Sequence, residues 1–365
     1  MRIATGRQTA VETVIALMRA SVGEARAAES LPPGPPWAKV IEVASAGLVL
    51  SALASGARAL PGGLGALGEA GGFLAAMEAA NAARNERLMQ RLGEAVAALA
   101  AAGIPAVALK GAVFALEDPA QAPWRFLGDL DLLIPTERMQ DAVAAFAPLS
   151  YHAGGEPDLG DELHHFPPLL HADGETVLEL HSRLFPTAGN ALLPPERLLA
   201  HAQPLEHVAG LFVPVAVDRM VHLIAHAQIA NRRFERRTLS LRDALDFVHL
   251  MRRGDIHLDS VLDRFEAHGH GPAAAGFLLA MNRLIGGPPP LPRSTRAAAH
   301  WSDAAIASLR SPARLRWRVA WDSLRDHAAR LMRHESRRRA WTGLRDPVRR
   351  RHVLQRALFG WRNTR

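Results

Sequence analysis

Apolar and polar residues follow two different periods along this chain. Residues 81–102 place apolar side chains at helical spacing, which predicts one long amphipathic helix. Short apolar runs at 104–109 and 129–134 predict strands instead, with a helix over 112–116 between them. A further helix is expected over 137–146. Strands and helices therefore alternate in the first half of the chain.

The segment that follows predicts a β-hairpin. Residues 165–171 and 176–181 are apolar-rich runs on either side of the turn signal Asp173-Gly174. Beyond the hairpin the pattern is helical: Asp218 is expected to cap a helix that ends near residue 231, with another over 238–252.

Proline and glycine clusters and the composition divide the chain into regions. Residues 1 to about 100 are rich in Ala and Leu and are broken by a proline cluster at 32–36 and by a glycine-rich stretch at 61–72. We predict four regions: an N-terminal helical region (1–83), a core with the strands (84–190), a helical domain (191–292) and an Arg-rich helical C-terminal region (293–365).

Two acids on the strand at 129–134 are the strongest chemical signal. Residues i and i+2 of a strand lie on one face, so Asp129 and Asp131 are expected to project together. Two carboxylates that close repel unless a cation lies between them, and Mg²⁺ accepts such oxygen ligands. The alternative is that both acids lie on the solvated face of an edge strand.

The neighbouring segments favour the metal interpretation. Gly111 follows an apolar run at the expected strand-to-helix junction, where a glycine lets backbone N–H groups approach a phosphate. The predicted strand at 176–181 carries Glu179 and His181 on one face, which supplies a third carboxylate. Only two of the 43 basic residues are lysines, Lys39 and Lys110, so Lys110 is a candidate for a compact charge on phosphate.

Two further candidates have competing interpretations. Arg125 could bind a triphosphate with its bidentate guanidinium, or it could form a structural ion pair with one of the nearby acids. His222 and His226 have the i, i+4 spacing of a helix face, but no acid lies between them as a hydrolytic metal site would require. Packing or hydrogen bonding explains this pair better.

These motifs together resemble the uncharacterised nucleotidyltransferase family of the polymerase-β-like superfamily. The resemblance covers about residues 84–255 and lies in Lys110-Gly111, Arg125, Asp129-x-Asp131 and Glu179-x-His181. It implies an α+β fold with a small mixed β-sheet, flanked by N-terminal and C-terminal helical regions. The chain differs from the family pattern in two places, with Glu179 where Asp is usual and Ser182 where Trp is usual.

The resemblance also implies residue roles. Asp129, Asp131 and Glu179 would be the catalytic acids and would hold Mg²⁺ or Mn²⁺. Lys110, Gly111, Arg125 and His181 would bind or orient the nucleotide. The expected reaction moves a nucleoside monophosphate from an NTP to an acceptor on a small molecule, peptide or protein.

Composition and charge restrict the remaining classes. The 365 residues are 48% hydrophobic and include no cysteine, which excludes disulfides and thiolate metal sites. Residues 1–20 lack a signal-peptide pattern and the apolar run at 43–54 is too short to span a bilayer, so we expect no transmembrane segment and a cytoplasmic protein.

The C-terminal region carries 19 Arg, no Lys and five acids between residues 293 and 365, a net charge of +14. Such a region can bind nucleic acid or another polyanion, or it can form a solvated helical face, which we favour. Two alternatives to the enzyme therefore stay open: a non-catalytic protein of the same fold, and a nucleic-acid-binding protein.

Overall fold

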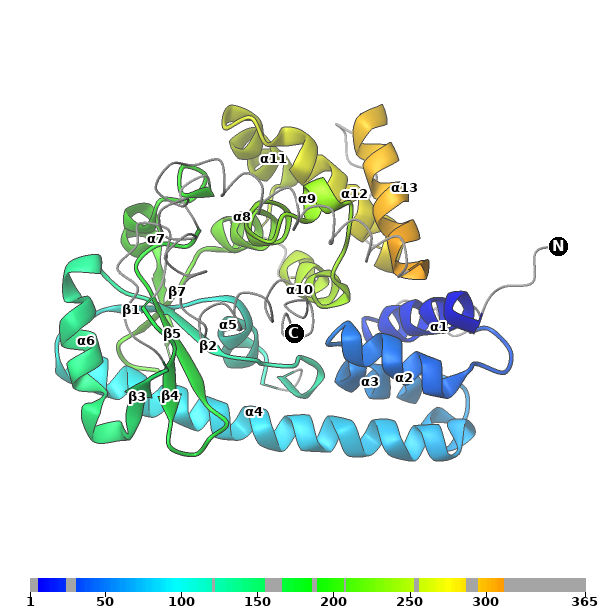
Figure 1. Ribbon diagram of the computed structural model, residues 1–365, viewed down its shortest axis with the longest axis horizontal. Coiled ribbons are helices and arrows are strands. Elements are labelled where there is room, and N and C mark those ends of the chain that lie inside the picture. Colours follow the sequence, from blue (N-terminus) through cyan, green and yellow to red (C-terminus); the bar gives the residue numbers. More distant parts are fainter. Residues whose placement is uncertain are drawn as a thin grey trace, which may run out of the picture. The chain divides into compact units, whose positions relative to one another are not determined.

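The computed structural model describes residues 6–23, 31–119, 122–154, 166–185, 189–206, 208–252, 256–286 and 295–311. The described residues up to Arg310 belong to one compact unit, shown in Figure 1. Most of the Arg-rich C-terminal region, including its arginine runs at 337–339 and 349–351, lies outside the described residues. The boundaries of the four predicted regions stay a prediction.

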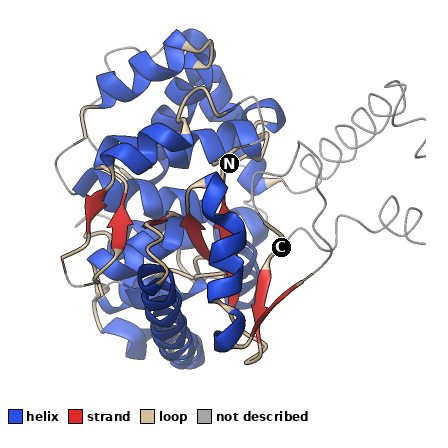
Figure 2. Cartoon of the chain, turned by 90° about the vertical axis from the view of Figure 1, so that its left-hand side faces the viewer, coloured by secondary structure: helices blue, strands red, loops and turns tan. Residues whose placement is uncertain are grey.

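Within the described ranges, seven short strands form one mixed sheet in the order β3-β4-β5-β2-β1-β7-β6. Figure 2 shows these strands with helices packed around them. The central neighbours β2–β5 and β1–β7 are parallel, whereas β1–β2, β3–β4, β4–β5 and β6–β7 are antiparallel. The strands are β1 (Ala106–Ala108), β2 (Leu130–Leu133), β3 (Tyr151–Ala153), β4 (Leu169–His171), β5 (Val177–His181), β6 (Gln203–Pro204) and β7 (Leu211–Val213).

Helices account for most of the remaining described residues, which confirms the α+β class. They are α1 (Gly6–Ser21), α2 (Trp37–Ala46), α3 (Leu50–Arg58), α4 (Glu69–Ala101), α5 (Lys110–Glu117), α6 (Met139–Ala145), α7 (Pro195–His201), α8 (Ala216–Ala225), α9 (Arg233–Arg236), α10 (Leu241–Arg252), α11 (Leu258–Ala267), α12 (Gly271–Ile285) and α13 (Arg296–Arg310). A π-helical segment, η7 (His226–Ala230), continues α8. Short 3₁₀ helices are η2 (Gly63–Leu67), η3 (Ala122–Trp124), η4 (Thr136–Arg138) and η5 (Ala147–Leu149).

Alternation along the central strands separates a core face from a second face. Leu130, Leu132, Leu178 and Leu180 pack into one buried cluster with apolar residues of α4, α5 and α6. The intervening residues of β2 and β5 point to the opposite face, because successive side chains of a strand alternate. That second face carries the acids and His181.

A second apolar cluster joins helices from the two ends of the described chain. It includes residues of α1, α2 and α3 together with residues of α8, α10, α12 and α13. The side chain of Arg19 in α1 also donates hydrogen bonds to the main-chain oxygens of Arg283 (2.9 Å) and Leu284 (2.9 Å) at the end of α12. The N-terminal helices are therefore packed against the C-terminal ones, and both belong to the same compact unit.

Several predicted elements differ from the observed ones. The long helix begins at Glu69 rather than near residue 81, and the residues at 137–146 form η4 followed by α6. The hairpin is confirmed as β4 and β5, and its turn is closed by the Asp173 carboxylate, which accepts hydrogen bonds from the main-chain N–H of Glu175 and of Thr176. Strands β3, β6 and β7 were not predicted, because runs of two or three residues are too short to show a period.

The expected cap at Asp218 is wrong. The N-cap of α8 is Val215, and Asp218 lies inside the first turn, where its buried carboxylate accepts a hydrogen bond from Arg264 at 2.6 Å. The Asp218 carboxylate therefore forms an ion pair with Arg264 of α11 instead of capping the start of α8. The helical backbone continues past Ala225 through the π-helical segment to Ala230, which agrees with the predicted end near residue 231.

Candidate active site

Strands β2 and β5 bring the predicted acids together. The two strands are parallel neighbours, and their register places Asp131 beside Glu179 and Leu133 beside His181. Residues in register on paired strands project to the same face, and so do residues two apart on one strand. Asp131, Glu179 and His181 therefore share one face of the sheet.

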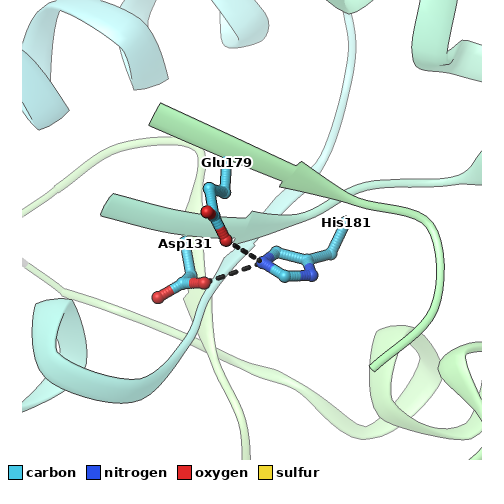
Figure 3. Close-up of side chains that lie close together, drawn as sticks. All are labelled: Asp131, Glu179 and His181. Carbon is cyan, nitrogen blue, oxygen red and sulfur yellow. Dashed lines mark hydrogen bonds and ion pairs between the residues drawn. The ribbon is translucent and has the colours of Figure 1, made fainter. Parts of the chain in front are cut away.

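Their side chains form a compact group (Figure 3). The His181 Nε2 atom lies 2.7 Å from an Asp131 carboxylate oxygen and 3.6 Å from a Glu179 carboxylate oxygen. Each residue offers one atom that could bind a metal ion, and these three atoms lie within 4.8 Å of one another. Asp131 and His181 are buried, while the Glu179 side chain keeps 20% of its surface exposed. Glu179 is thus the member of the group nearest to solvent.

Lys110 adds a cation to this group from the neighbouring strand-to-helix turn. Its Nζ donates to the same Asp131 oxygen at 2.6 Å. Lys110 has φ +47°, a left-handed conformation that costs a non-glycine residue on the order of 1 kcal/mol or more. Since Leu109 is extended and α5 begins at Lys110, this conformation turns the chain from strand to helix beside the acids.

The charges of the group shift one another's pKa values. Burial alone would raise the pKa of Asp131, but Lys110 and His181 lower it far below its usual range. Burial would likewise lower the pKa of Lys110 and of His181, yet the neighbouring carboxylates raise both. The hydrogen bond from His181 lowers the pKa of Glu179. The group therefore favours the charged form of Asp131 and Glu179, with the Lys110 ammonium beside Asp131.

Asp129 lies just before β2 and is not part of the group formed by Asp131, Glu179 and His181. Burial is the main cause that raises its pKa, and the negative charge of Asp131 adds to the increase. The charge of Glu179 raises it further. Asp129 thus interacts electrostatically with both acids without joining their close contact.

Gly111 and Arg125 lie against each other. A Cβ atom built on Gly111 would lie 2.1 Å from Arg125 Nη1 and 2.7 Å from Leu127 Cδ2. The space beside the glycine is therefore filled by a guanidinium, which is a packing reason for glycine at this position. The hypothesis that a phosphate approaches the Gly111 backbone stays a prediction.

The buried Arg125 pairs with an acid that the sequence did not indicate. Its Nε and Nη2 donate to the two carboxylate oxygens of Asp246 in α10, at 2.7 and 2.8 Å. The ion pair considered from the sequence was with an acid near Arg125 along the chain. Asp246 is 121 residues away, and no local pattern links the two positions.

The histidine pair packs as the preferred interpretation expected. The ring of His222 lies edge-on to Phe185, with ring centroids 5.4 Å apart, and 6.1 Å from the ring of His226. Burial is the main cause that lowers the pKa of His226 well below its usual value. His226 is therefore neutral near pH 7.

A pocket adjoins the acid group where α5, α8 and α10 meet. Its open volume is about 680 Å³, and Lys110, His222, His226 and Arg242 are among the residues that line it. The sequence alone gave Arg242 no role. A signal was present in retrospect, since Arg242 follows the buried Leu241 at the start of an amphipathic helix.

The geometry fits a divalent cation. Two carboxylates and one imidazole nitrogen converge on one face, and carboxylate oxygens are the ligands that suit Mg²⁺ and Mn²⁺. In this structure the Lys110 ammonium supplies positive charge that offsets Asp131, and His181 Nε2 contacts the same carboxylate. A cation beside Glu179 and Asp131 would serve the same electrostatic purpose.

None of the helices in the described part of the chain is long and apolar enough to cross a membrane. Comparison with curated proteins and with solved structures found no match. Residues 33–286, by contrast, match the model of a protein family described as uncharacterised nucleotidyltransferase.

Proposed function

We propose, from the premise that the chain belongs to the uncharacterised nucleotidyltransferase family, that it transfers a nucleoside monophosphate from an NTP to an acceptor hydroxyl or phosphate. Pyrophosphate is the second product. The acceptor belongs to a small molecule, a peptide or a protein, and membership of the family leaves it open.

One observation carries this proposal. Asp131 and Glu179 stand in register on parallel strands, with His181 on the same face and the Lys110-Gly111 turn beside them. Nucleotidyl transfer develops negative charge on the phosphate that is attacked and on the leaving pyrophosphate, so it needs positive charge held at a fixed position. The two strands fix the carboxylates that would hold a cation, and the turn fixes the ammonium group of Lys110.

Asp131, Glu179 and the nearby Asp129 would hold the divalent cation, which when bound supplies Lewis-acid stabilisation of phosphate oxygens. Lys110 would bind a phosphate oxygen through its ammonium group, because substrate and carboxylate can share its three donors. His181 would hold the Asp131 carboxylate in place through the 2.7 Å contact. Its ring is buried and its orientation is restricted accordingly.

The test is a transfer assay with each α-labelled NTP, Mg²⁺ or Mn²⁺ and a cell extract, with pyrophosphate and labelled product as readouts. Asp129→Asn, Asp131→Asn and Glu179→Gln should each reduce product formation strongly. Glu179→Gln should spare NTP binding, since its partly exposed carboxylate contributes charge more than packing. Asp141→Asn is the matched control, because Asp141 is an exposed acid of α6 that pairs with Arg138.

Circular dichroism and thermal unfolding of each variant separate lost chemistry from lost structure. Asp131 is buried and contacts both Lys110 and His181, so Asp131→Asn can also destabilise the protein. Unchanged transfer in folded Asp131→Asn and Glu179→Gln variants would exclude the proposed catalytic group. NTP binding without any transfer by the wild-type protein would favour a non-catalytic protein of this fold.

A further inference from the structure

The pocket lined by residues of α5, α8 and α10 adjoins the acid group and therefore has the position of a substrate site. Lys110 belongs both to the pocket wall and to the acid group, so a bound molecule would reach from one to the other. Val113, Phe114, Leu223 and Leu250 form much of its apolar lining.

Most cations that line this pocket are already paired with a carboxylate. Lys110 contacts Asp131, Arg125 contacts Asp246, and Arg219 contacts the buried side chain of Glu117. The fourth, Arg242, has no ion pair or side-chain hydrogen bond to any residue in the described part of the chain. Its Nε is buried and lacks a hydrogen-bond partner there. A buried donor of this kind costs free energy unless a ligand completes it.

Arg242 also acts electrostatically on the acid group. Burial and the charge of Asp131 raise the pKa of Asp129, while Lys110 and Arg242 lower it. The adjacent acid, Asp243, has an ion pair with Arg233 at 3.9 Å. The charge of Arg242 acts on Asp243 without an ion pair, and it partly offsets the increase in the Asp243 pKa that burial causes. Arg242 is thus a cation beside the acids whose own hydrogen-bonding capacity is unused in the described structure.

We propose that Arg242 binds the triphosphate of the NTP from α10, while Lys110 binds it from α5. The inference rests on the proposed function, and it gives Arg242 the role that the sequence suggested for Arg125. A guanidinium binds phosphate oxygens with two parallel N–H donors, and a charged donor already placed in a pocket loses little freedom on binding. Arg125 uses the same two-donor geometry for Asp246.

The experiment measures binding of inorganic triphosphate, of ATP and of adenosine to the full chain by calorimetry, with Mg²⁺ present. Arg242→Gln should weaken triphosphate and ATP binding by about 10-fold to 100-fold, the range for loss of charge-assisted hydrogen bonds. Adenosine has no phosphate, so its binding should not change. Arg242→Lys keeps the charge without the fork and should lie between the wild-type protein and Arg242→Gln.

Arg87→Gln is the matched control, because Arg87 is an exposed arginine of α4 that pairs with Glu175 away from the pocket. Wild-type triphosphate affinity in a folded Arg242→Gln protein would overturn the proposal, as would a wild-type protein that does not bind triphosphate. The two proposals fail separately. Arg242-dependent binding without nucleotidyl transfer would refute only the reaction, and transfer with unchanged affinity in Arg242→Gln would refute only the role of Arg242.

Discussion

Replacement of Gly111 by alanine should destabilise the protein, although alanine normally stabilises a helix. Gly111 lies in the first turn of α5, and the added Cβ would lie 2.1 Å from Arg125 Nη1 and 2.7 Å from Leu127 Cδ2. Both distances are far below van der Waals contact, so one of the three residues must move. Arg125 has little room to do so, because its other nitrogens are held by Asp246.

The magnitude follows from three contributions. Overpacking of a buried site costs about 1–3 kcal/mol, and disruption of a buried ion pair costs about 3–5 kcal/mol. Alanine in place of glycine returns about 1 kcal/mol in a helix. If Arg125 shifts without losing Asp246, the free energy of unfolding should fall by about 1 kcal/mol, and by about 5 kcal/mol if the pair breaks as well.

The assay is urea unfolding followed by circular dichroism, without nucleotide. Gly93→Ala in α4 is the control, since a Cβ there meets no atom within 4 Å, and it should be neutral or stabilising. In an Arg125→Met background, which lacks the guanidinium, Gly111→Ala should cost less. Equal stability of Gly111→Ala and wild type, or an equal cost in both backgrounds, would refute the packing argument and return Gly111 to a role in phosphate approach.

Two further predictions concern buried or hydrogen-bonded carboxylates. Main-chain and side-chain hydrogen bonds from the β4–β5 turn lower the pKa of Asp173 against the opposing effect of burial. Its contribution to stability is therefore present above the ordinary pKa of 3.8 and is lost as the pH falls below it. Asp173→Asn should destabilise the protein at pH 7, and the difference from wild type should shrink toward pH 2 in unfolding measurements; a constant difference would contradict this. Arg264→Gln should lower the unfolding free energy by about 3 kcal/mol, because it leaves the buried Asp218 without its 2.6 Å partner. Arg197→Gln is its control in thermal unfolding, since Arg197 is exposed and 3.9 Å away; equal effects of the two variants would rule out a specific pair.

Local alternation was sufficient to predict the two faces of the central strands. Leu130 and Leu132 face the core, and Asp131 faces the other side, as the two-residue period of a strand requires. The same reasoning placed Glu179 and His181 on one face of β5. The boundaries were less accurate, as α4 shows. Its first residues, 69–80, are rich in Ala and give a helical period too weak to show where the helix begins.

The sequence by itself determined which chemical groups share a strand face and which turn precedes them, because backbone geometry over a few residues sets side-chain direction. Tertiary structure alone decided that β2 and β5 are parallel neighbours in register, that Arg125 pairs with Asp246, and that Arg242 lines the pocket without a carboxylate partner among the described residues. Such contacts join residues tens to more than a hundred positions apart. They depend on how whole helices and strands bury their apolar faces, and no local period contains that information.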